Sequence, residues 1–281
     1  MDKIYTVETG AIRVFDTTDF SPERILECGQ IFRYERRGEN YEVVANNRLC
    51  TLIKENDCVI IKCDDTDYFV NYFDLDRDYA SIRERIEALG YEKEVEYGKG
   101  IRLLRQDPFE MLISFIVSAN NHIPRIRAIL NRISERYGQK LGKFYAFPTP
   151  EELSRATVEE LKSLGLGYRA PYVLDTARAV LDGGLDGLET LPDDSLRRAL
   201  LSFKGVGGKV ADCIMLFAYS RYSRFPVDTW VVQAYGKTKR EAKELERSLT
   251  AKYKDISGFV QQYVFYHKRN NPDTNKSTFK R

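Results

Sequence analysis

A glycine-rich turn followed by a lysine is the feature of this sequence that most suggests chemistry. Three glycines surround one valine over residues 205–208, and Lys209 comes next, with Asp228 nineteen positions further on. Glycines allow a tight turn and a close approach of two backbones, and the free N–H groups of a following helix can bind one phosphate. Each feature also has a simpler interpretation: an ordinary helix–helix turn, a solvated lysine, and an aspartate that caps a helix and contributes about 1 kcal/mol.

The elements around this turn are predicted to be helices. Apolar spacing indicates one helix at Asp193–Phe203 and a second at Gly208–Tyr219, with a third over Asp228–Tyr235. In the second helix Val210, Ile214 and Phe217 fall on one apolar face, whereas Lys209 and Cys213, four residues apart, share a different face. The pattern therefore predicts a helix–hairpin–helix at about residues 196–219, which holds a lysine and a cysteine away from the main core face.

Length and composition predict two globular domains. The chain has 281 residues, 43% hydrophobic and 31% charged, and no apolar run approaches the roughly 20 residues of a membrane helix. No basic and apolar leader follows Met1, so we expect a protein of the cytoplasm that contacts no membrane. The net charge of +2 conceals an asymmetry: residues 1–100 carry −8, residues 101–200 carry +1, and residues 201–281 carry +9. A basic C-terminal third is compatible with a nucleic-acid partner.

The five cysteines argue against disulfide and metal frameworks. They are odd in number and scattered, as expected in a reducing compartment. Cys58 and Cys63 are close together, but no second pair or nearby histidine completes a metal site. The 68 residues after Cys213 contain no cysteine, which excludes a C-terminal iron–sulfur cluster. The sequence thus predicts no metal site.

The predicted fold class is α+β, with an N-terminal antiparallel sheet domain followed by a mainly helical domain. Alternating patterns with intervening turn signals predict five strands and one short helix in the first part. The strands are expected at Lys3–Val7, Ala11–Phe15, Tyr41–Val44, Leu49–Ile53 and Val59–Cys63, and the helix at Thr18–Leu26. Helical periodicity is predicted after Tyr91. The expected domains are 1–98 (sheet with flanking helices) and 99–269 (helical), followed by a polar tail at 270–281.

The second part is predicted to be a series of helices. Pro108–Ser118 is apolar on more than one face and Ile123–Tyr137 is amphipathic. Thr149 and Thr157 each precede an acidic first turn, which is typical of a helix start. Further helices are expected at Pro171–Leu181, Arg240–Tyr253 and Phe259–Arg269.

The order Gly-Val-Gly-Gly-Lys-Val-Ala-Asp-Cys over 205–213, followed by Pro-Val-Asp over 226–228, resembles the helix–hairpin–helix Gly/Pro/Asp superfamily of DNA glycosylases. The order and spacing of these residues resemble the 8-oxoguanine DNA glycosylase branch of that superfamily in particular. Four further blocks, in the same order along the chain, resemble the blocks of that family. They are Cys28–Arg33, Gly100–Glu110, Ile116–Arg125 and Leu164–Ala170.

The resemblance implies roles for the catalytic and base-binding residues. Lys209 would be the nucleophile that attacks C1′ of the sugar and forms a Schiff base, which requires a lowered pKa of its amine. Asp228 would be the carboxylate that stabilises an oxocarbenium-like transition state. The carbonyl of Gly29 would accept a hydrogen bond from N7–H of the oxidised base, which normal guanine lacks. Cys213 and Phe265 would sandwich the flipped base, and Gln261 would read its Watson–Crick edge.

The resemblance also implies residues that contact DNA. Asn120, Arg125, Tyr168 and Arg169 would fill the vacated stack and hold the orphan cytosine. The hairpin residues Gly205, Val206 and Gly207 would contact a phosphate. On the resemblance alone the partner is duplex DNA with oxidised guanine, the protein is a monomer associated with the nucleoid or the nucleus, and no cofactor is required, although a cation at the hairpin is compatible with the pattern.

Four positions depart from the family pattern. Lys204 stands where the hairpin usually has a proline, and Trp230 stands where eukaryotic members have a histidine that touches a phosphate. His122 replaces an asparagine and Pro124 replaces a small residue beside Arg125. These positions bear on individual phosphate contacts and on the preference for cytosine.

The predicted function is a bifunctional DNA glycosylase and AP lyase that removes 8-oxoguanine opposite cytosine in base excision repair. One alternative is a monofunctional alkyl-base glycosylase of the same superfamily, which would keep the aspartate but would not need Lys209. Another is a non-catalytic helix–hairpin–helix DNA-binding module. That module would explain the turn and the basic end, but not the pair Lys209 and Asp228.

Overall fold

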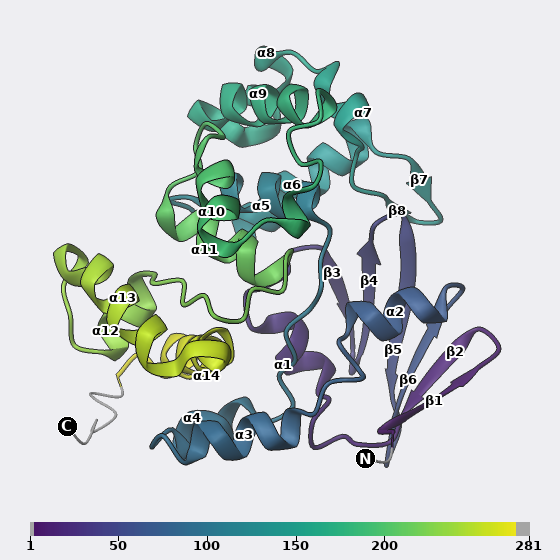
Figure 1. Cartoon of the computed structure of the whole chain (residues 1–281). Coiled ribbons are helices and arrows are strands. Elements are labelled where there is room, and N and C mark those ends of the chain that lie inside the picture. Colours follow the sequence, from purple (N-terminus) through teal and green to yellow (C-terminus); the bar gives the residue numbers. More distant parts are fainter. Residues whose placement is uncertain (1–2, 274–281) are drawn as a thin grey trace.

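The computed structural model describes residues 3–273, in which a twisted antiparallel sheet packs beside a larger group of helices (Figure 1). The six strands are ordered β1-β2-β6-β5-β4-β3, and a short hairpin, β7-β8, forms a separate two-stranded sheet. Their bounds are β1 (Tyr5–Glu8), β2 (Ala11–Val14), β3 (Tyr34–Arg37), β4 (Asn40–Ala45), β5 (Arg48–Lys54), β6 (Val59–Cys63), β7 (Lys140–Leu141) and β8 (Phe144–Tyr145). The predicted α+β class, with the sheet first, is confirmed.

The helices follow largely in the second part of the chain. Those before residue 100 are α1 (Pro22–Glu27), α2 (Thr66–Tyr72), α3 (Tyr79–Glu87) and α4 (Glu92–Gly98). Those after it are α5 (Pro108–Ser118), α6 (Ile123–Tyr137), α7 (Pro150–Ser154), α8 (Val158–Leu161), α9 (Ala170–Leu181), α10 (Asp193–Leu201), α11 (Gly208–Phe217), α12 (Thr229–Ala234), α13 (Ala242–Tyr253) and α14 (Ser257–Asn270). Of the helices within residues 3–273, none combines the length and the apolar character that crossing a bilayer requires.

One face of the sheet forms a core of its own. Strand alternation places Ile12, Leu52 and Ile61 in a cluster that also contains Phe69 and Tyr72 of α2. Figure 1 shows α2 lying across the sheet near β5 and β6. The sequence did not predict α2. The Asp65 side chain accepts a hydrogen bond from the Tyr68 backbone N–H at 3.0 Å and caps this helix.

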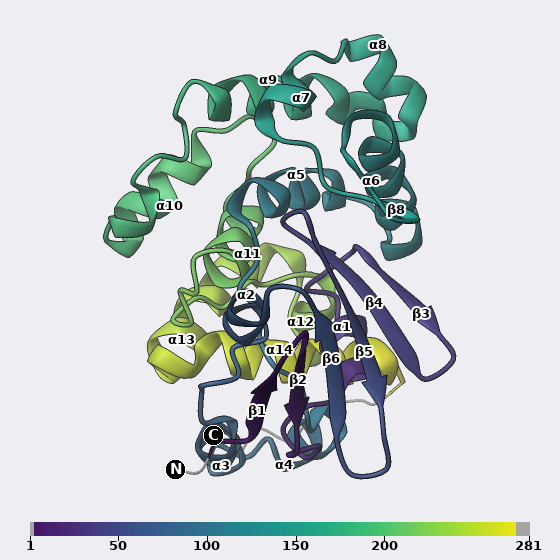
Figure 2. The same cartoon turned by 90° about the vertical axis from the view of Figure 1, so that its right-hand side faces the viewer.

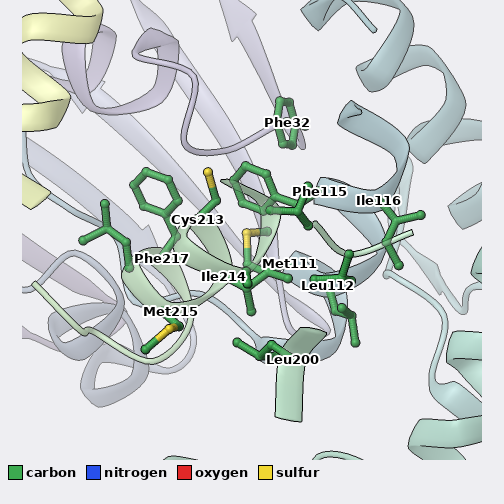
Figure 3. Close-up of a cluster of buried hydrophobic side chains, with 14 of the residues drawn as sticks. Phe32, Met111, Leu112, Phe115, Ile116, Leu200, Cys213, Ile214, Met215 and Phe217 are labelled. Carbon is green, nitrogen blue, oxygen red and sulfur yellow. The ribbon is translucent and has the colours of Figure 1, made fainter. Parts of the chain in front are cut away.

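The helical core is built around α5 and α11. Residues 109–117 of α5 are all buried, which is typical of a helix at the centre of a domain. Figure 3 shows side chains of the two helices in contact, with Cys213 beside the rings of Phe115 and Phe217 and its sulfur directed away from Leu200. Those rings stack with their centroids 5.8 Å apart. The helical core thus extends to the side chains that line the site described below.

The helical region begins earlier than its periodicity predicts. Helix α3 starts at Tyr79 behind the N-cap Asp78, and Tyr79, Ile86 and Val95 belong to the helical core rather than to the sheet core. At the other end, α14 runs to Asn270, so the predicted tail 270–281 starts inside a helix, and residues 274–281 lie outside the described residues.

Helix α1 and the loop after it lie between the two cores. Ile25 and Leu26 are buried in the sheet core, whereas Cys28 and Phe32 are buried in the helical core. The side chain of Gln30 is fully buried and donates from Nε2 to the carbonyl of Arg102 at 2.8 Å. This packing on both sides fixes the position of the loop that contains Gly29.

Candidate active site

The predicted helix–hairpin–helix is present as α10, a short loop and α11. Only Gly205 has a left-handed backbone, with φ +84°, and a Cβ atom there would lie 2.9 Å from the Tyr172 ring of α9. Gly207 is the N-cap of α11 and offers no side-chain cap, so the first N–H groups of this helix are open to a ligand. Lys204, which stands where the family's hairpin usually has a proline, forms an exposed ion pair of 2.7 Å with Asp175.

A cavity of about 390 Å³ lies between α5, α11, α14 and the loop after α1. Its volume is in the range of pockets that hold small organic ligands. Lys209 in the first turn of α11 and Asp228 at the start of α12 both line it. The four predicted base-binding residues line the same cavity: Gly29, Cys213, Gln261 and Phe265. The fold therefore brings together six predicted site residues from positions 29 to 265.

The Lys209 amine lies between an aromatic ring, a thiol and a carboxylate. Its Nζ is 5.4 Å from the centroid of the Phe115 ring. Burial lowers the pKa of Lys209. Charge interactions with Cys213 and Asp228 and a hydrogen bond with Cys213 raise this pKa by more than burial lowers it, so the net shift is upward. The expectation of a lowered Lys209 pKa is therefore wrong for the protein without DNA, because Cys213 and Asp228 both favour the protonated amine. Burial likewise raises the pKa of the Cys213 thiol, to about 11.

Asp228 is the N-cap of α12, as predicted. Its carboxylate accepts a hydrogen bond from the Val231 backbone N–H at 2.9 Å. Burial raises the pKa of this carboxyl group; the Val231 N–H, Lys209 and Arg269 act in the opposite direction but do not cancel the rise. Capping fixes the carboxylate where it also faces the cavity, so both predicted roles are compatible with one conformation.

Gly29 occupies a position that no larger residue fits without strain. Its φ is +87°, and a Cβ atom would lie 3.0 Å from both Phe265 Cε1 and Arg269 Nη1. On the facing helix, Gln261 is 5% exposed and its Oε1 is buried without a hydrogen-bond partner. A buried amide oxygen left unpaired costs free energy unless a ligand supplies a donor. The part of the cavity that Gly29 and Gln261 line thus contains a hydrogen-bond acceptor with which a donor group of a ligand can pair.

The residues predicted to hold the orphan cytosine do not line the cavity; they lie on the turn after α5, in the first turn of α6 and on the segment before α9. Tyr168 is 56% exposed, and Asn120 and Arg125 are exposed. Arg169 is instead buried, and its guanidinium donates to the carbonyls of Ala119 and Asn120 in the turn between α5 and α6. The structure therefore places these four residues together, but with Arg169 engaged in holding the turn.

Two family models together match residues 13–255 of the chain. Residues 13–112 match the N-terminal domain of 8-oxoguanine DNA glycosylase, and residues 113–255 match the HhH-GPD superfamily of base excision DNA repair proteins. The chain belongs to the 8-oxoguanine DNA glycosylases of the HhH-GPD superfamily.

Individual relatives agree with this assignment. The chain is 32% identical to an N-glycosylase/DNA lyase of Saccharomyces cerevisiae over 74% of its own length and 65% of the yeast protein, less than two thirds of that relative. It is 31% identical to a probable N-glycosylase/DNA lyase of Methanothermobacter thermautotrophicus, over 70% of this chain and 72% of that one. The crystal structure of a Clostridium acetobutylicum 8-oxoguanine glycosylase/lyase, bound to DNA with cytosine opposite 8-oxoguanine, superposes with a TM-score of 0.90 at 37% identity, covering 95% and 98% of the two chains.

The departures from the family pattern have local explanations in this glycosylase. The His122 imidazole caps α6 by accepting a hydrogen bond from the Arg125 N–H at 3.4 Å, and Pro124 lies in the first turn of that helix. Trp230 lines the cavity next to Asp228. All three residues therefore lie at the start of a helix and line the cavity.

Several cavity residues were not predicted as site residues. Phe32, Phe115 and Phe217 line the cavity but have the apolar character of core positions, so the sequence does not distinguish the two roles. Arg269 had a usable signal, because it follows Phe265 by four residues on the same helix and therefore shares its face.

Proposed function

We propose that this glycosylase excises 8-oxoguanine opposite cytosine from duplex DNA and then cleaves the strand as an AP lyase, within base excision repair. The observation that carries the proposal is the presence of the Lys209 amine and the Asp228 carboxylate in one cavity with a set of base-binding side chains. A base inside a duplex is out of reach of such a cavity, so the lesion must flip out of the stack.

The chemistry assigns one step to each of the two groups. Once deprotonated, the Lys209 amine attacks C1′ of the sugar, the bond from C1′ to the base breaks, and the base leaves with a proton that the attacking amine loses. Asp228, held as an N-cap, stabilises the positive charge that develops on the sugar. The Lys209 adduct opens to a Schiff base, and loss of a C2′ proton with departure of the 3′ phosphate completes β-elimination.

Two alternatives explain fewer of these observations. A monofunctional alkyl-base glycosylase would need Asp228 but not a lysine in the cavity beside it. A non-catalytic helix–hairpin–helix module would need the turn and the basic C-terminal third, but not the unpaired amide oxygen of Gln261 at a pocket of this size. The bifunctional enzyme uses all of them.

The remaining parts of the proposal concern partners and place in the cell. The partner is double-stranded DNA with an oxidised guanine, bound by a monomer in the compartment that holds the DNA. The reaction uses Lys209 and Asp228 without a cofactor; within residues 3–273 no cluster of three His, Cys, Asp or Glu side chains has the arrangement of a metal site. A cation at the hairpin stays a prediction.

Borohydride trapping on duplexes with 8-oxoguanine opposite each of the four bases tests the proposal. A covalent adduct is expected, strongest opposite cytosine and absent in Lys209→Gln. The matched control is Lys204→Gln, which removes a neighbouring exposed lysine and should leave the adduct in place. An undiminished adduct in Lys209→Gln would show that another amine is the nucleophile. Equal trapping on an unmodified duplex would exclude 8-oxoguanine as the substrate.

A further inference from the structure

We propose that two side chains of α14, Gln262 and Arg269, are positioning residues that hold the turn before Gly29 and thereby set the discrimination between 8-oxoguanine and guanine. The inference rests on the proposed function, because it concerns the carbonyl of Gly29 as the group that reads the oxidised base. Neither side chain is required to touch the base.

Both side chains bind backbone carbonyls that immediately precede Gly29. Gln262 is 2% exposed, and its Nε2 donates to the carbonyl of Cys28 at 2.7 Å. The Nη2 of Arg269 donates to the carbonyl of Glu27. The two peptide groups before Gly29 are therefore both anchored to α14 (Figure 2 shows this helix beside α1).

The peptide group between Gln30 and Ile31 is anchored as well. The Nε2 of Gln106 donates to the carbonyl of Gln30 at 2.9 Å, and both glutamines are buried. The carbonyl of Gly29 lies between these anchored groups, and no donor from residues 3–273 is bound to it. The loop thus presents one unused carbonyl between neighbours that are all fixed, next to the cavity that Gly29 lines.

Helix α14 also carries the two side chains predicted to contact the base. Gln261 and Phe265 line the cavity, and Arg269, one turn beyond Phe265, lies with its guanidinium carbon 5.4 Å from the centroid of the Phe265 ring. Gln262 and Arg269 are seven residues apart and share a helix face. A single rigid helix therefore sets the distance between the Gly29 carbonyl and the Phe265 ring.

This geometry matters because the two bases differ at one atom that faces a carbonyl. N7 of 8-oxoguanine carries a hydrogen and can donate, whereas N7 of guanine is a bare acceptor that the same carbonyl repels. A hydrogen bond of this kind is effective only over donor–acceptor distances of roughly 2.7–3.2 Å. If Gln262 and Arg269 no longer held the carbonyls of Cys28 and Glu27, the Gly29 carbonyl would move out of this range and would lose both the attraction for the lesion and the repulsion of guanine.

The experiment measures dissociation constants of three duplexes in the Lys209→Gln background, which binds without turnover. The duplexes carry 8-oxoguanine, guanine or a tetrahydrofuran abasic analogue opposite cytosine. Arg269→Met keeps the aliphatic stem and removes the donor, Arg269→Lys keeps a charged donor, and Gln262→Met removes the other anchor. Asn270→Ala, on an exposed residue of the same helix, is the control.

Arg269→Met and Gln262→Met should each lower the preference for 8-oxoguanine over guanine by about tenfold, a change of roughly 1.4 kcal/mol. Affinity for the abasic analogue should stay constant, and Arg269→Lys should retain most of the preference. An unchanged preference in both methionine variants, or an equal loss of affinity for all three duplexes, overturns the inference. If the Lys209→Gln protein with an intact α14 does not prefer 8-oxoguanine at all, the proposed function itself fails.

Discussion

The cavity and the surface predicted to hold the orphan cytosine would contact the two members of one base pair, but they are built in different ways. The cavity is lined by residues from helices whose other faces form the core, and Cys213 and Gln261 are only 3% and 5% exposed. The cytosine surface consists of the turn after α5, the first turn of α6 and the segment before α9, where Tyr168 is 56% exposed. The cavity is therefore shaped by the packing of the protein alone, whereas three of the four residues of the surface are exposed and Arg169 is buried.

Arg169 illustrates the difference between the cavity and the cytosine surface. Its guanidinium donates to two carbonyls of the turn after α5, so a cytosine must compete with or share those bonds. In the cavity, by contrast, the amide oxygen of Gln261 has no hydrogen-bond partner among the described residues, so a ligand can bind it without breaking an existing bond. We expect changes in the cavity to affect the chemistry for every opposite base, and changes on the surface to affect the choice of opposite base.

The largest effect is expected for Asp228→Asn. Asparagine is as good an N-cap as aspartate, so the melting temperature should hardly change while the negative charge is lost. Removing one group that stabilises transition-state charge typically costs 10²–10³-fold in rate. Single-turnover excision opposite all four bases should fall by about this factor and to a similar extent. A loss below tenfold would leave Asp228 with a capping role alone.

A smaller and selective effect is expected for Arg125→Ala. Arg125 is exposed, and within residues 3–273 its side chain donates one hydrogen bond, to the carbonyl of Gly165 at 3.5 Å, so stability should change by no more than about 0.5 kcal/mol. The ratio of excision opposite cytosine to excision opposite adenine should fall about tenfold, since a lost base contact costs roughly 1–3 kcal/mol.

Arg136→Ala is the matched control for this variant. Arg136 is an exposed arginine further along α6, paired with Glu160 rather than placed near the cytosine surface. Its replacement should leave the ratio unchanged. Equal losses for all four opposite bases in Arg125→Ala would remove the distinction between cavity and surface.

The sequence predicted the cavity residues better than their surroundings. Helix–hairpin–helix spacing and the N-cap at Asp228 are local properties, so their geometry follows from neighbouring residues. That six residues between positions 29 and 265 would meet in one cavity followed from the family resemblance, because periodicity alone does not place one helix against another. Helices α2 and α3 were not predicted. Asp65 and Asp78 cap these two helices within a segment rich in β-formers.

Charge environment was the part that the sequence predicted worst. A lowered pKa of Lys209 follows from burial alone, but the net direction depends on Cys213, one turn away, and on Asp228 from another helix. The same holds for Arg169, whose bonds to the turn after α5 depend on a contact between residues fifty positions apart. Such balances are set by tertiary contacts, and no local pattern encodes them.

The smallest effect is expected for Cys213→Ala, measured as a change in pH dependence. Cys213 raises the pKa of the Lys209 amine, so its removal should lower that pKa. Only the neutral amine is nucleophilic, and the rate of Schiff-base formation therefore rises with pH until the amine is deprotonated. In Cys213→Ala this rise should therefore occur at lower pH than in the unmodified protein. The measurement is the initial rate of trapping on a duplex with a preformed abasic site, which bypasses base excision.

Cys213→Ser keeps a polar neighbour for the amine and should move the pH profile less than Cys213→Ala does. A profile that does not move in Cys213→Ala would mean that Asp228 and burial alone determine the charge of the nucleophile.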